Sequence, residues 1–91
     1  DADTSFDSMA AAWALSRIAA DDAQVAGRVV PVLLRGLTST DEQTRLNSAE
    51  SLGDLGSNAA TAAAALKKTA QEDKSAAVRE AAKAARKRVA G

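Results

Sequence analysis

Glu50 and Asp54 are the two residues whose type and spacing come closest to those of a catalytic acid–base pair. On a helix, residues four positions apart lie on the same face, so the two carboxyl groups would be neighbours. In such a pair, burial among apolar groups usually raises the pKa of one carboxyl group so that it can donate a proton. The surrounding sequence offers no apolar pocket and no basic or nucleophilic companion. We therefore interpret both residues as solvated side chains on a polar helix face.

Other kinds of catalytic chemistry lack the residues that they need. The chain contains no histidine and no cysteine, which excludes disulfides, thiolate and Ser–His nucleophiles, and zinc sites made of Cys and His. No phosphate-binding or dinucleotide-binding glycine motif is present, because Gly53 and Gly56 end a predicted helix and do not open one. We expect a protein that is not an enzyme and that binds no metal and no cofactor.

A cluster of basic residues lies near the end of the chain: Lys83, Arg86, Lys87 and Arg88. Such a cluster could bind phosphates or an acidic partner. However, cations also interact favourably with the C-terminal end of a helix dipole, Glu80 interrupts the positive charge, and only 2% of the residues are aromatic. We interpret the cluster as the solvated outer face of a last helix, and nucleic acid is not an expected partner.

The composition favours a protein made only of helices. Alanine provides most of the 46% of hydrophobic residues, and the chain has one proline and five glycines. The predicted helices cover residues 5–20, 22–37, 58–69 and 75–90, and the third helix of five lies between residue 37 and its stop at Gly56.

Several residues are predicted to set the helix ends. Asp21-Asp22 is expected to cap the second helix and Asn58 the fourth, and Gly56 is the expected stop of the third. Either Ser39 with Glu42 or Thr40 with Gln43 forms a capping box before the third helix. Pro31 is expected either to kink the second helix or to move its start to near Arg28.

Equivalent residues recur along the chain. Arg45 and Arg79 are 34 positions apart, Leu33 corresponds to Leu66 at an offset of 33, and Leu15 corresponds to Leu52 at an offset of 37. These offsets predict two helical hairpins, residues 22–56 and 58–90, after a lone second helix at residues 5–20. A single hairpin cannot bury its own apolar face, so the copies are expected to stack as a solenoid. Residues 1–91 would form one domain.

The repeated segments resemble HEAT repeats, in the short form associated with phycobiliprotein lyases. The signature consists of an acidic turn, a Val-Arg pair, and an alanine-rich stretch ending in Leu-Gly. It is present in DEQTRLNSAESLGDLG (41–56), in EDKSAAVREAAKAA (72–85) and, more weakly, in AAWALSRIA (11–19). VVPVLLRGL (29–37) resembles the matching first helix. Thr44 replaces the usual valine, and Arg86-Lys87 replaces Leu-Gly. The resemblance implies a right-handed α-α superhelix of five helices and about two and a half repeats, expected to belong to a longer array.

The resemblance also implies a structural ladder, in which an acid on a turn contacts the arginine of a neighbouring repeat. The residues concerned are Asp41, Arg45, Asp73 and Arg79. Asp41 lies four positions before Arg45 and is expected to contact it within the same helix.

In HEAT-like arrays the second helices line the concave surface, so the resemblance predicts a non-catalytic scaffold that binds a protein partner there. The candidate residues are Phe6, Trp13, Arg17, Asn47, Glu50 and Asp54. As an alternative, Phe6 and Trp13 would pack against a preceding repeat or against residues 1–5.

Other interpretations stay open at this point. The chain could be an accessory domain of a bilin lyase-type or nucleic-acid-acting HEAT enzyme. Acids dominate residues 1–60 and bases dominate residues 61–91, so copies could also associate head to tail in a salt-sensitive manner. No membrane span or targeting signal is visible, and the cytoplasm is the default expectation for the location.

Overall fold

The computed structural model describes residues 6–90, which form five α-helices and one 3-10 segment and contain no strand. The elements are α1 Phe6–Ile18, α2 Ala23–Gly36, α3 Glu42–Leu55, η2 Gly56–Ala62, α4 Ala63–Glu72 and α5 Ala76–Ala90. The prediction of an all-α fold with five α-helices is confirmed.

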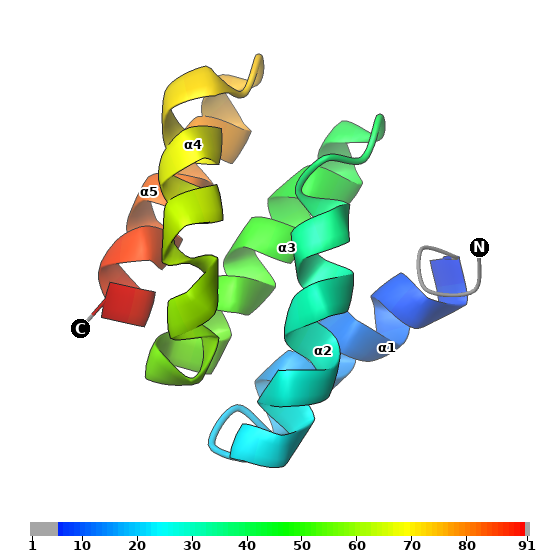
Figure 1. The fold of residues 1–91 in the computed structure, drawn as a ribbon. Helices are drawn as coiled ribbons and strands as arrows, with labels where there is room; N and C mark the ends of the chain where they lie inside the picture. Colours follow the sequence, from blue (N-terminus) through cyan, green and yellow to red (C-terminus); the bar gives the residue numbers. More distant parts are fainter. Residues whose placement is uncertain (1–5, 91) are drawn as a thin grey trace.

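The helices form two layers (Figure 1). One layer contains α1, α3 and α5, and α3 packs against both of its neighbours. The other layer contains α2 and the continuous η2–α4 segment, which lie across the first layer. The extents of 31 × 30 × 17 Å agree with a slab two helices thick, since packed helix axes lie about 8–10 Å apart.

The predicted helix boundary signals of α2 and the end of α3 can be compared with the structure. Of the predicted pair Asp21-Asp22, Asp22 caps α2, with its Oδ1 accepting hydrogen bonds from the backbone N–H groups of Gln24 (2.9 Å) and Val25 (3.1 Å). Gly56 ends α3 with φ = 55°, a conformation that side-chain-bearing residues rarely adopt, as predicted. Pro31 lies inside a helix that begins at Ala23, so of the two alternatives for Pro31 the start near Arg28 is wrong.

The predicted capping boxes before α3 are wrong. Asp41 is the N-cap, and its Oδ2 accepts hydrogen bonds from the backbone N–H (3.0 Å) and the hydroxyl (2.7 Å) of Thr44. The carbonyl groups of Ser39 and Thr40 instead accept hydrogen bonds from the Arg45 guanidinium, which keeps these two residues in the turn before the helix.

The predicted N-cap role of Asn58 is also wrong. Its Nδ2 donates a hydrogen bond to the carbonyl oxygen of Ala20 at 2.9 Å and so joins two loops that are distant in the sequence. The chain here forms the 3-10 segment η2, and α4 begins only at Ala63, without a side-chain cap.

The core lies between the two layers. Its largest fully buried apolar side chains are Leu33, Leu52, Leu66, Val78 and Val89. Gly36 and Gly53 let α3 approach its neighbours closely, because a Cβ on Gly36 would overlap the Ser48 side chain and one on Gly53 would lie 3.1 Å from Ala85 Cβ.

Candidate partner-binding groove

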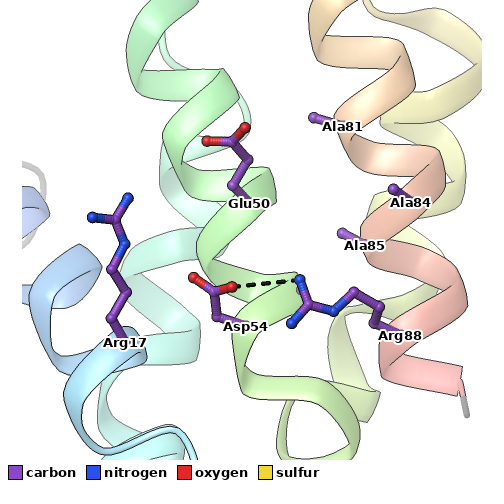
Figure 2. A pocket seen from close by; sticks show the side chains of 8 residues that line it. Arg17, Glu50, Asp54, Ala81, Ala84, Ala85 and Arg88 are labelled. Atoms are coloured by element: carbon purple, nitrogen blue, oxygen red, sulfur yellow. Dashed lines mark hydrogen bonds and ion pairs between the residues drawn. The ribbon is translucent and has the colours of Figure 1, made fainter.

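A groove of about 380 Å³ lies on the face formed by α1, α3 and α5 (Figure 2). Its lining residues are Arg17, Glu50, Gly53, Asp54, Ala81, Ala84, Ala85 and Arg88. The groove therefore crosses the whole layer, from an arginine on α1 to an arginine on α5.

Helical spacing explains why these side chains share one face. Residues three and four positions apart are neighbours on a helix surface, which places Glu50 beside Gly53 and Asp54 on α3 and Ala81 beside Ala84 and Ala85 on α5. The floor consists of glycine and alanine, so the backbones of α3 and α5 lie near the surface. A partner segment can approach these two helices closely.

The charges in the groove are unequally satisfied. Arg88 Nη1 lies 3.4 Å from Asp54 Oδ1, and the two side chains are 58% and 30% exposed, so water screens this pair strongly. Glu50 and Arg17 are exposed and make no hydrogen bond or ion pair within residues 8–90. Within the described residues, the groove thus presents an unpaired carboxylate on α3 and an unpaired guanidinium group on α1, beside the Asp54–Arg88 ion pair (Figure 2).

The structure brings three of the candidate residues, Arg17, Glu50 and Asp54, to the same groove. Asn47 lies one turn before Glu50 on α3, where its Oδ1 accepts a hydrogen bond from Gln43 Nε2 at 2.9 Å. The sequence analysis did not include Arg88 in this site. The missed signal was the spacing, since Asp54 and Arg88 are separated by 34 positions, the same offset that relates Arg45 to Arg79.

The two aromatic candidates differ in what the structure shows. The side chain of Phe6 lies outside the described part of the structure. Trp13 is half-buried and packs against the core, with its Nε1 3.5 Å from Ser48 Oγ. The described neighbour of Trp13 is thus α3, and neither sequence-based interpretation of this residue included that contact.

The remaining cations of the basic cluster, Lys83, Arg86 and Lys87, are exposed on α5 and do not line the groove.

The proposed ladder residues lie at the edge of the slab where α2 turns into α3 and α4 turns into α5. Arg45 Nε lies 2.9 Å from Asp73 Oδ2, and each side chain is only 7% exposed. Arg79 Nη1 donates a hydrogen bond to the Asp73 backbone oxygen at 2.7 Å. The Arg45–Asp73 contact thus joins an acid on one turn to the arginine of the neighbouring hairpin.

Asp41 was expected to contact Arg45 through its side chain as part of this ladder. Its carboxylate instead accepts the capping hydrogen bonds from Thr44. The hydroxyl and backbone N–H of Thr44 hold the pKa of Asp41 below its ordinary value.

The pKa of Asp73 is likewise below its ordinary value. Burial alone would raise the pKa, but the backbone N–H of Ser75 (2.9 Å) and the guanidinium of Arg45 stabilise the ionised form more strongly. Asp73 is therefore a charged group built into the contact between the hairpins.

Among the residues that the structure describes, no group of three or more His, Cys, Asp and Glu side chains is arranged to hold a metal ion. None of the described helices combines the length and the apolar character that crossing a membrane requires.

Stacked helix pairs, internal repeats and an arginine–aspartate contact between neighbouring hairpins together define a helical repeat protein. Residues 7–86 match the family described as HEAT repeats, and the chain belongs to that family. Neither a curated protein nor a solved structure matches the chain. HEAT repeats generally act as scaffolds in protein interactions.

Proposed function

We propose that this protein is a non-catalytic scaffold that binds a protein partner across the face formed by α1, α3 and α5. Three observations support this function: the family to which the chain belongs, the groove across this face, and the two unpaired charges in it. The groove carries most of the proposal, because its residues come from three helices that only the stacked fold brings together.

The groove chemistry suggests how a partner would be oriented. Glu50, one turn from Asp54 on α3, would pair with a cationic side chain, and Arg17 on α1 would pair with an anionic one (Figure 2). Two opposite charges at fixed positions favour one direction of the bound segment over the reverse, which contributes to specificity more than to affinity. Asn47 and Trp13 extend the same face, and Phe6 belongs to the proposal through its sequence position alone.

Site-specific crosslinking would test this function. A photoreactive benzoylphenylalanine at position 50 should capture the physiological partner in cells, whereas the same group at the exposed Lys67 of α4, in the other layer, should not. Glu50→Lys should abolish co-purification of the captured partner, while Lys67→Glu should leave it unchanged. Equal capture from both positions would contradict the proposal.

A further inference from the structure

The outward face of α1 is apolar and uncovered. Its residues are Ala11, Ala14, Leu15 and Ile18, all exposed. At the offset of 37 that relates Leu15 to Leu52, their equivalents on α3 are Ser48, Ser51, Leu52 and Leu55, all buried. The contrast is greatest for Ile18, which is 82% exposed where Leu55 is 3% exposed, and for Leu15, which is 40% exposed where Leu52 is 0% exposed.

Other helices of the same chain bury the equivalent face on α3. Both α1 and α2 pack against α3, and the indole of Trp13 reaches Ser48 on this face. The repeat thus shows that a surface of this kind is covered by helix packing elsewhere in the molecule.

A groove of about 350 Å³ between α1 and α2 adjoins the exposed strip. Its lining is Ser8, Ala11, Ala12, Leu15, Val25, Arg28, Val29 and Val32. Ala12 and Val29 also belong to the buried core, so the groove is an outward continuation of the packing between the layers. Arg28 is the single charged residue in this lining, and it has no hydrogen bond or ion pair in the described part of the chain.

A second copy of the chain does not fit this surface. The outward face of α5 carries Glu80, Lys83 and Lys87, all exposed, at the positions where α3 has Leu46, Ala49 and Gly53. Stacking that face head to tail on α1 would bury charges against apolar side chains, which is unfavourable. Contact between two α1 faces would bring together two grooves that each carry an arginine and no carboxylate in the lining.

We propose that the α1 strip and the α1–α2 groove dock an amphipathic helix of a partner protein, whose apolar side covers Leu15 and Ile18 and whose carboxylate pairs with Arg28. The apolar lining requires an apolar strip on the partner, and the unpaired guanidinium group specifies the sign of the flanking charge. This surface is separate from the groove that contains Glu50.

Two synthetic peptides can serve as probes. Both are fluorescein-labelled alanine–leucine helices of about 18 residues, a length at which such peptides are helical, with the same leucine strip. One has glutamates beside the strip and the other has lysines. Anisotropy titrations should show that the glutamate peptide binds about tenfold or more tightly than the lysine peptide.

Substitutions then locate the binding. Ile18→Glu should weaken the glutamate peptide about tenfold or more, because it places a charge inside the apolar contact. Arg28→Glu should reverse the preference between the two peptides. Ala77→Glu on the exposed start of α5 is the control, and it should leave binding unchanged.

Three results would overturn the proposal: equal affinity for both peptides, unchanged binding by Ile18→Glu, or dimerisation that Ile18→Glu abolishes. The last result would show that a second copy occupies the strip. Because Ile18 and Arg28 are exposed, both variants should fold, and circular dichroism verifies this before the titrations.

Discussion

The guanidinium group of Arg45 bonds the carboxylate of Asp73 across 28 positions of sequence, with 2.9 Å between Nε and Oδ2. The same guanidinium also holds the carbonyl oxygens of Ser39 and Thr40, and so fixes the turn before α3 to the turn before α5. Ser75 adds a second link between these turns, with its hydroxyl 2.7 Å from Glu42 Oε2.

Removal of one partner of this buried pair should be costly. We expect Arg45→Ala to lower the free energy of unfolding by about 3–5 kcal/mol, because it leaves the Asp73 carboxylate buried without its counter-charge. Urea denaturation followed by circular dichroism measures the loss. Arg88→Ala, which breaks the exposed pair with Asp54, is the control and should cost under about 1 kcal/mol. Equal losses would show that burial does not distinguish the two pairs.

Acid should weaken the same contact. The pKa of Asp73 is lower in the folded chain than in the unfolded chain, so its contribution is fully present above the ordinary carboxyl pKa of about 3.9. It is lost as the pH falls from there through the lowered pKa. We expect Asp73→Asn to be less stable than the wild type at neutral pH and to lose less further stability between about pH 5 and pH 2. Thermal melts across this range test the expectation.

A matched control for this acid effect is Asp21→Asn, an exposed aspartate outside the ladder. It should retain the acid sensitivity of the wild type. If Asp73→Asn showed the wild-type slope, Asp73 would not be a source of the acid sensitivity.

The two equivalent leucines provide a test of the stacking. Leu52→Ala should destabilise the protein by about 2–5 kcal/mol, because it leaves a cavity between the layers. Leu15→Ala, at the equivalent position on the outward face of α1, should cost less, about 1 kcal/mol, because Leu15 is 40% exposed and loses correspondingly less buried contact. Chemical denaturation of both variants measures the difference. A small loss for Leu52→Ala would contradict its place in the core.

Two glycines of α2 should respond in opposite directions to alanine. Gly36→Ala should destabilise by about 1–3 kcal/mol, because the new methyl group collides with the side chain of Ser48 on α3. Gly27→Ala should stabilise by about 0.5–1 kcal/mol, because no atom lies within 4 Å of the new methyl group and alanine is the better helix former. Melting temperatures of the two variants measure these effects. If both substitutions raised the melting temperature, helix propensity alone would determine the stability of the variants.

The helices and their stacking order could be predicted because these features depend on local sequence and on repetition. Asp22 and Gly56 act through their own and adjacent residues, so their roles can be seen in a short window. Asn58 and Arg45 instead donate hydrogen bonds to residues that are distant in the sequence, Ala20 and Asp73 respectively. The sequence next to Asn58 therefore predicts an N-cap role that the structure does not show.

The groove was only partly predictable, for a related reason. Glu50 and Asp54 were candidates because the resemblance to HEAT repeats places the polar side of the second helices on the concave surface. The part played by Arg88 depends on the packing of α5 against α3, which brings its guanidinium to Asp54. Oppositely charged residues at equivalent positions of successive repeats are a signal that could have found this pair.

The two edges of the slab are joined with unequal strength, and this has a mechanical consequence. At the edge with the turns before α3 and α5, a buried ion pair and the Ser75–Glu42 bond connect neighbouring hairpins (Figure 1). At the opposite edge, the exposed bond from Asn58 to Ala20 joins the loops, beside the 3-10 segment η2. The hairpins should therefore separate more readily at the edge with Asn58 than at the edge with the ion pair. Amide hydrogen exchange should be faster at residues 56–62 than at residues 41–47.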